Sequence, residues 1–309
     1  MIKGSRVLIT GGTGSLGKEL VRQLLDAGSR VVVYSRNEER QYELQQEHRH
    51  TSLELKIGDV RDTATLSDAL RGCDFAIHAA AMKDVIFCER QPTQCVFNNI
   101  DGSRSFIEAV KRSKVKKAVG VSTDKAAAPS NVYGASKYIM EKMFEEANRY
   151  SETTFSSVRF GNMIDSRGSL VSAWKQNPQG EIKLTHPEVA RFFFSVAEAA
   201  ETTLHALEVA RGGEVYIRKM KKARIKDVLA VITGKNEFEI MGLFPGEKIH
   251  EDLVSQNEVG YCWEHDSYFS ITPDQPNPTP PPMFNTENAA AFSLDELRKL
   301  IFPERNGKV

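Results

Sequence analysis

The sequence predicts an α/β protein with a doubly wound, mostly parallel sheet and a smaller C-terminal lobe. A short β-branched run, Arg6–Thr10, leads into a glycine cluster, then an amphipathic stretch, Lys18–Ala27, and a second buried-strand pattern, Arg30–Tyr34. Strand-like and helix-like segments continue to alternate as far as Phe160. This alternation is typical of a parallel sheet that helices cover on both faces.

The individual elements follow from the spacing of their apolar residues. Short runs of branched or aromatic residues predict buried strands, and apolar residues three or four positions apart predict helices. The strands expected are Arg6–Thr10, Arg30–Tyr34, Leu53–Ile57, Phe75–His78, Lys117–Ser122 and Phe155–Phe160. The helices expected are Lys18–Ala27, Thr63–Leu70, Asn99–Ser113, Tyr133–Arg149 and Leu294–Ile301.

The second half of the chain has a less regular pattern. Gly161–Val171 and Thr185–Phe193 are predicted to be loops, and the proline-rich Pro273–Pro282 is predicted to be a surface connector. We therefore expect a main domain over residues 1–161 and a smaller ligand-binding lobe over residues 162–309, with strands that can return to the main sheet. Ser293 is the expected N-cap of the last helix, with Glu296 three residues later.

Composition narrows the class of protein. The 309 residues carry a formal net charge of +0, so the overall balance predicts no nucleic-acid partner. Four cysteines without CxxC spacing predict free thiols and no metal site. No apolar stretch approaches the roughly 20 residues that cross a membrane, and the first strand leaves no room for a signal peptide. We expect a cytoplasmic protein without membrane insertion.

The glycine cluster between the first strand and helix predicts a Rossmann-type dinucleotide site. Gly11 allows a tight turn, Gly14 lets the backbone approach a pyrophosphate, and Gly17 permits close packing of helix on strand. The positive end of the helix then holds the phosphates. The residues assigned to this turn are Gly11, Thr13, Gly14, Ser15, Leu16 and Gly17.

The end of the second strand favours NADP over NAD. NAD sites place an acidic residue there for the ribose hydroxyls, but this chain has Ser35 and Arg36, which can bind a 2′-phosphate. Glu38 and Glu39 lie nearby and keep NAD open, and an exposed Arg36 without a ligand also stays open.

Further cofactor residues are expected after the third and fourth strands. Asp59, with Val60 beside it, can accept the adenine amine, although an Asp at a strand end is equally often a turn former. Small residues after His78 let the backbone pass close to a cofactor. The other residues assigned to this site are Ala79, Ala80, Ala81, Lys83 and Asn99.

Tyr133 and Lys137 form the strongest catalytic signal. They are four residues apart in a predicted helix, so the hydroxyl and the ammonium can converge on one face. A nearby ammonium and a nicotinamide cation favour tyrosinate, which lowers the phenol pKa and makes Tyr133 a usable base. Both residues are assigned to the catalytic and to the cofactor site.

A second acid–base pair follows the strand Lys117–Ser122. Thr123 is positioned to hydrogen-bond a substrate hydroxyl, and Asp124 with Lys125 adds proton-transfer groups that a simple alcohol dehydrogenase does not need. A solvated Asp–Lys turn is the alternative. If the pair is functional, it indicates chemistry beyond one hydride and one proton.

These motifs together resemble the UDP-N-acetylglucosamine 4,6-dehydratases of the extended short-chain dehydrogenase family. The resemblance runs from the first strand to the last helix and includes TGGTGSLG, YSRNEERQ, GDVRD, HAAAMKDVIFCE, VSTDKAAAP, NVYGASK, RFGNMIDSRGS and GEKIHEDL. It implies a UDP-sugar substrate, a role in polysaccharide biosynthesis and a tightly bound, recycled NADP. It also implies a homo-oligomer, for which the helix Tyr133–Arg149 offers a dimer face.

The resemblance also implies a role for each catalytic residue. Tyr133 deprotonates the C4 hydroxyl while the cofactor takes the hydride, and Lys137 lowers the phenol pKa. Lys125 is then the C5 base, and Asp124 protonates the departing C6 hydroxyl. The cofactor returns its hydride to C6.

Substrate contacts are implied by the same comparison of motifs. The residues expected to bind the UDP-sugar are Lys83, Asn162, Arg167, Gly168, Ser169, Arg191 and Glu247. The segment from Gly246 to Glu251 resembles a further nucleotide contact. The chain departs from the family pattern at residues 82–87 and at Ala190, which leaves the exact sugar open and inversion at C5 only favoured.

Two other functions remain open at this point. A UDP-hexose 4-epimerase would share Tyr133 and Lys137 and prefer NAD, but it would not need Asp124 and Lys125. A non-catalytic sensor of the same fold would usually lack Tyr133 or Lys137, and this chain has both.

Overall fold

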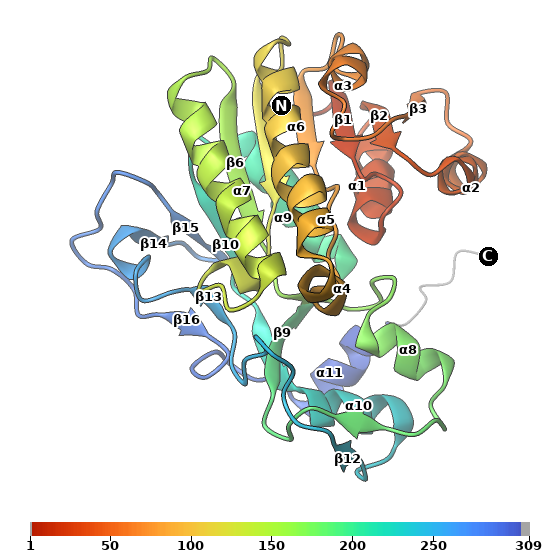
Figure 1. Ribbon diagram of the computed structural model, residues 1–309, viewed down its shortest axis with the longest axis vertical. Coiled ribbons are helices and arrows are strands. Elements are labelled where there is room, and N and C mark those ends of the chain that lie inside the picture. Colours follow the sequence, from red (N-terminus) through yellow and green to blue (C-terminus); the bar gives the residue numbers. More distant parts are fainter. Residues whose placement is uncertain (1, 304–309) are drawn as a thin grey trace.

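The computed structural model describes residues 2–303 and confirms the doubly wound α/β fold (Figure 1). Its main sheet has nine strands in the order β14-β15-β10-β6-β5-β4-β1-β2-β3. Pairing is parallel from β3 to β10 and antiparallel for β15 and β14. These strands are β1 (Arg6–Thr10), β2 (Arg30–Ser35), β3 (Leu53–Ile57), β4 (Phe75–His78), β5 (Lys117–Val121), β6 (Thr154–Arg159), β10 (Val215–Arg218), β14 (Cys262–Glu264) and β15 (Tyr268–Ile271).

Helices cover both faces of this sheet, so its strands are apolar on both sides. In β1, Val7 and Ile9 join one core with α1 and α9, whereas Leu8 joins the other core with α3, α6 and α7. The helices around the main sheet are α1 (Ser15–Asp26), α2 (Glu38–His48), α3 (Thr63–Ala69), α4 (Val85–Arg90), α5 (Pro92–Cys95), α6 (Gly102–Lys111), α7 (Val132–Arg149) and α9 (Val196–Val209). The carboxyl ends of the parallel strands therefore share one edge, where ligands of such sheets bind.

Two differences from the predicted elements have physical reasons. α2 was not predicted because only Gln41 and Leu44 of its residues are buried, which leaves no apolar stripe. The predicted helix Asn99–Ser113 is in fact a π-helix, η1 (Val96–Asp101), continued by α6. A π-helical turn changes which side chains face the core, and it buries Asn99.

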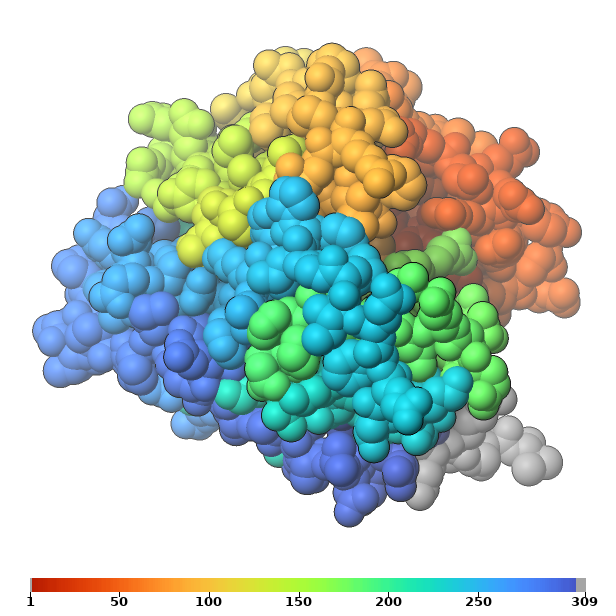
Figure 2. All heavy atoms as spheres, turned by 60° about the horizontal axis from the view of Figure 1, so that its bottom comes forward, coloured from red at the N-terminus to blue at the C-terminus, as the bar shows by residue number. Residues whose placement is uncertain are grey.

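The chain beyond Gly161 contributes both to the main sheet and to a separate core. β10, β14 and β15 return to the main sheet, while α8 (Leu170–Gln176), α10 (Ile225–Thr233) and α11 (Leu294–Ile301) surround their own apolar cluster. Figure 2 shows the green to blue part of the chain lying across the end of the red to yellow part. The division at residues 161 and 162 stays a prediction.

Short strands and 3-10 turns complete this second part. The predicted loop Thr185–Phe193 was wrong from Ala190 on, where β9 begins; the five residues of β9 are all buried and so show no alternation. The predicted loop Gly161–Val171 likewise contains the two-residue strand β7 and the start of α8. Ser293 caps α11 in a capping box with Glu296, as predicted. The remaining elements are β7 (Asn162–Met163), β8 (Lys183–Leu184), β9 (Ala190–Phe194), β11 (Lys221–Arg224), β12 (Glu239–Ile240), β13 (Asp252–Val254), β16 (Phe284–Asn285), η2 (Asp124–Ala126) and η3 (Val259–Tyr261).

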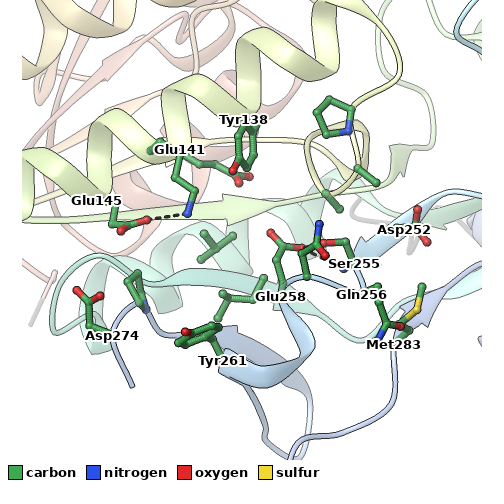
Figure 3. Close-up of a pocket in the computed structure, with 18 residues that line it drawn as sticks. Tyr138, Glu141, Glu145, Asp252, Ser255, Gln256, Glu258, Tyr261, Asp274 and Met283 are labelled. Carbon is green, nitrogen blue, oxygen red and sulfur yellow. Dashed lines mark hydrogen bonds and ion pairs between the residues drawn. The ribbon is translucent and has the colours of Figure 1, made fainter. Parts of the chain in front are cut away.

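A buried ion cluster joins α7 to the C-terminal part of the chain. The Arg159 side chain has no exposed surface, and its Nη2 lies 2.6 Å from Glu141 of α7 and 2.8 Å from Glu258. Its Nη1 donates to the Leu253 carbonyl at 2.8 Å. Glu141 and Glu258 also line a cavity of about 650 Å³ (Figure 3), which contains none of the predicted site residues.

We expect Arg159→Met to lower the free energy of unfolding by roughly 3–5 kcal/mol, because it leaves two carboxylates buried without their partner. Urea denaturation measures this change. Arg149→Ala is the matched control, since Arg149 also pairs with two carboxylates but its side chain is 49% exposed. It should cost less than about 1 kcal/mol. Equal costs for the two variants would contradict the role given to the buried cluster.

Candidate active site

Two cavities of about 500 Å³ each meet at the carboxyl edge of the main sheet. The first cavity lies over the glycine turn and the ends of the N-terminal strands, and the second is lined by residues from the C-terminal part. Both cavities are lined by Lys83, Thr123, Tyr133, Gly161, Met163 and Ser166. Two ligands bound in these cavities would therefore meet at Tyr133 and Thr123.

The glycine turn packs closely on the neighbouring backbone and lines the first cavity. Gly11 has φ +69°, and a Cβ there would lie 2.8 Å from the Ala80 nitrogen. A Cβ on Gly17 would lie 2.5 Å from the Gly12 Cα, so helix and turn pack without side chains. Gly14 is the N-cap of α1 and provides no side-chain cap. The backbone N–H groups of this helix end can therefore hold phosphate.

The other end of the first cavity carries two arginines. Arg36, at the end of β2, lies 3.6 Å from Asp59 in an exposed ion pair and donates to Asn98. Arg40, in the first turn of α2, lines the same cavity and was not predicted. Arg40 follows Arg36 by four residues, and this spacing could have identified it. The sequence analysis missed it because α2 has no apolar pattern that predicts a helix. Ser35 also lines the cavity, and its hydroxyl accepts from Gln41 at 3.0 Å.

Asp59 and Asn99, both assigned to the cofactor from the sequence, do not line either cavity. Asp59 accepts hydrogen bonds from the Arg61 guanidinium, which holds its pKa at about 2. The buried Asn99 donates to Ser136 and exchanges hydrogen bonds with the Met82 backbone. These contacts fix the segment after β4 against α7. The ligand roles of Asp59 and Asn99 stay predictions, whereas Val60 and Ala79–Ala81 line the first cavity.

Tyr133 lies in the first turn of α7, where Asn131 caps the helix by accepting from the Gly134 nitrogen. A Cβ on Gly134 would lie 2.2 Å from the Lys125 carbonyl oxygen, so a glycine lets this turn pack directly on η2. Burial raises the pKa of Tyr133 to about 12, although Lys125 and a hydrogen bond with Thr123 act to lower it. The net shift is thus opposite to the expected lowering.

Lys137 is buried one turn after Tyr133, with 3% of its surface exposed. Its Nζ lies 3.4 Å from the Met140 sulfur, and burial lowers its pKa to about 8. The cation that lowers the pKa of Tyr133 is Lys125, whereas the sequence predicted Lys137. Lys137 still lines the first cavity, and its role there stays a prediction.

Four charged groups form a row in and behind the wall of the second cavity. The Lys125 Nζ lies 2.9 Å from Asp124 Oδ1 and 3.6 Å from Glu251 Oε1, and Glu251 Oε1 lies 3.8 Å from Arg191 Nε. Lys125 and Arg191 line the cavity, but Asp124 and Glu251 do not. Asp124 also accepts from the Thr123 hydroxyl at 3.0 Å.

Most residues expected to bind the substrate lie around the second cavity. Lys83, Asn162, Ser169, Arg191 and Glu247 line it; among the other predicted substrate residues, Arg167 lines the first cavity and Gly168 neither. The Lys83 Nζ donates to the Arg167 carbonyl oxygen at 2.8 Å and so spans the junction. The lining residues that the sequence did not reveal include Trp174, Leu184, Thr185, Met241 and Phe244.

Residues 2–303 contain neither a candidate metal centre nor a candidate membrane-spanning helix. Within this part of the chain, no group of three or more His, Cys, Asp or Glu side chains is placed to hold a metal ion. None of its helices has the length and apolar character that crossing a membrane requires.

Comparison with known proteins places the chain in a family. A family model described as polysaccharide biosynthesis protein matches residues 7–273. A UDP-N-acetylglucosamine 4,6-dehydratase (inverting) of Campylobacter jejuni is 37% identical over 281 residues, which cover 88% of this chain and 84% of that protein. A protein of Methanocaldococcus jannaschii, described as an uncharacterized membrane protein, is 36% identical over 97% of this chain and 96% of its own length.

The chain is also similar to UDP-glucose 4-epimerases and to a solved structure over most of its length. A UDP-glucose 4-epimerase of Rickettsia typhi is 33% identical over 89% of this chain and 84% of its own length. The X-ray structure of Pen from Bacillus thuringiensis has a TM-score of 0.91 and 35% identity, covering 97% of this chain and 98% of that one. The chain belongs to the polysaccharide biosynthesis protein family.

Proposed function

We propose that this member of the polysaccharide biosynthesis family is an NADP-dependent UDP-N-acetylglucosamine 4,6-dehydratase, a hydro-lyase that inverts C5. The observation that carries the proposal is the second acid–base pair: Lys125 lines the second cavity, and Asp124 contacts both Lys125 and Thr123, which lines both cavities. Dehydration needs a C5 base and a C6 acid in addition to the C4 base. The relatives named as inverting dehydratases support the same substrate.

The first cavity fits a dinucleotide phosphate. The glycine turn at the start of α1 would hold the pyrophosphate, and Arg36 with Arg40 would hold the 2′-phosphate. When bound, NADP supplies a hydride acceptor that later returns the hydride to the same sugar, so the reaction needs no external oxidant.

The protein groups then move protons at three atoms of the sugar. Tyr133 takes the proton of the C4 hydroxyl, and Lys125, in its neutral amine form, takes the proton from C5. Asp124 protonates the C6 hydroxyl as it leaves. The Thr123 hydroxyl, which hydrogen-bonds both the phenol and Asp124, keeps these groups in one connected network.

The second cavity fits the UDP-sugar. Arg191 and Lys83 bring positive charge for a diphosphate, and Asn162 adds a polar group near the junction. The apolar side of the cavity, with Trp174 and Phe244, suits the flat face of a uracil. We propose that residues 162–309 form the substrate-binding lobe on this basis.

A UDP-sugar 4-epimerase is the second candidate function. It is favoured by the epimerase relatives, which are 32–33% identical to this chain. An epimerase would use Tyr133 and the cofactor in the same way, but its reaction has no proton-transfer step that needs Lys125 and Asp124. We therefore place the dehydratase first.

We also propose that the protein is cytoplasmic and that two copies of it associate. All four cysteines are buried and free, which fits a reducing cytoplasm.

Exposed apolar side chains gather on α4, η1 and α7, and we propose that two copies associate through this patch. Its residues are Ile86, Phe87, Val96, Phe97, Tyr138 and Ile139. The molar mass in solution, measured by light scattering, tests this.

We expect NADP to bind at least tenfold tighter than NAD, a difference of about 1.4 kcal/mol, because Arg36 and Arg40 pair with the 2′-phosphate. Isothermal titration calorimetry with each cofactor measures it. Arg36→Ala and Arg40→Ala should each weaken NADP and leave NAD nearly unchanged. Arg71→Ala, an exposed arginine that lines neither cavity, is the control. Equal affinities for the two cofactors in the wild-type protein would refute the preference.

We expect Tyr133→Phe to reduce turnover of UDP-N-acetylglucosamine by roughly 10²–10⁴-fold, since it removes the proton acceptor of the C4 hydroxyl. Binding of UDP should stay close to wild type. Tyr138→Phe, in the same helix but outside both cavities, is the matched control and should keep full activity. More than about a tenth of wild-type turnover in Tyr133→Phe would show that another group is the base.

A further inference from the structure

Glu251 is a buried carboxylate that the chemistry above does not use. Only 3% of the residue is exposed, and it lines neither cavity. Its backbone is fixed from both sides, because its N–H donates to the Thr286 hydroxyl and its carbonyl accepts from the Thr286 nitrogen. Because Glu251 lines neither cavity, it can act on a bound substrate only through the residues that it contacts.

Those neighbours are two cations that belong to different tasks. The Glu251 Oε1 lies 3.6 Å from the Nζ of Lys125, the proposed C5 base, and 3.8 Å from the Nε of Arg191, on the side proposed for the diphosphate. Each cation has a second carboxylate of its own, Asp124 for Lys125 and Glu247 for Arg191. Charges therefore alternate along one row, with Glu251 at its centre.

We propose that Glu251 is a positioning residue that joins Lys125 to Arg191 and sets the pH range in which Lys125 can take a proton. The proposal rests on the dehydratase function, in which Lys125 removes the C5 proton. Glu251 would hold the Lys125 side chain in the wall of the second cavity and connect it to Arg191, which would receive the diphosphate of the nucleotide.

The charges around Lys125 determine the sign of the effect. Burial and Arg191 act to lower the pKa of Lys125, but Asp124 and Glu251 outweigh them, so this pKa lies above the ordinary value for a lysine. Burial, together with the nearby Asp124, raises the pKa of Glu251 above its ordinary value, although Lys125, Arg191 and Lys248 act to lower it. The phenol of Tyr133 faces Lys125 from α7. Replacing Glu251 by a neutral side chain removes an anion, so the Lys125 pKa should fall.

The test is the pH dependence of kcat for formation of the dehydrated product. Because Lys125 acts as a free amine, kcat rises with pH through the Lys125 pKa. In Glu251→Gln we expect this acidic limb to move to lower pH by roughly 1–3 units, the usual effect of one opposite charge at this distance. A merely structural defect would lower kcat at every pH without moving the limb.

Glu247→Gln is the matched control. Glu247 contacts the same arginine at 3.2 Å and accepts from Thr185, but no contact joins it to Lys125. It should change KM and leave the acidic limb at its wild-type pH. Should Glu251→Gln fail to fold, Glu251→Asp, which withdraws the carboxylate by one methylene, should shift the limb in the same direction by a smaller amount.

An unmoved limb in the Glu251 variants, or an equal shift in Glu247→Gln, would overturn the role of Glu251 and leave the dehydratase function standing. If the wild-type protein forms no dehydrated product, the proposed function fails and the role of Glu251 falls with it.

Discussion

Buried charge at the carboxyl edge of the sheet is the constraint on which the rest of the structure depends. Lys125 and Arg191 are brought out of water in the wall of the second cavity, with Glu251 behind them, and each needs an opposite charge nearby to remain ionised. These charged residues and their partners lie on η2, on β9 and in the segment before β13, which are far apart in the chain. The second part of the molecule is therefore held against the first by the same groups that the proposed chemistry requires.

Helix α7 carries this constraint from the cavities to the interior. Tyr133, Lys137 and Glu141 are spaced by four residues, so they follow one another along one face of the helix. The first lines both cavities, the second is buried beside the first cavity, and the third pairs with the buried Arg159 of β6. The helix that positions the proposed base is thus anchored by a second ion cluster two turns away.

The sequence predicted the fold and much of the site because both depend on local patterns. Apolar runs located the parallel strands from β1 to β6 but not β10, and the ends of those strands necessarily meet at one edge, where Tyr133 and Thr123 lie. Arg40 was missed because α2 buries too few residues to show a helical period. The contact of Glu251 with Lys125 and the direction of the Tyr133 pKa shift depend on tertiary burial, which no spacing in the sequence reports.

The most direct test of the proposed dehydratase function is to incubate the protein with UDP-N-acetylglucosamine in heavy water, without added cofactor. NMR and mass spectrometry then identify the product. The account predicts a product that has lost the C6 hydroxyl, carries a C4 ketone and holds deuterium at an inverted C5, because Lys125 removes a proton that solvent replaces. A product isomeric with the substrate, with its C6 oxygen retained and no deuterium at C5, would contradict it and identify a 4-epimerase.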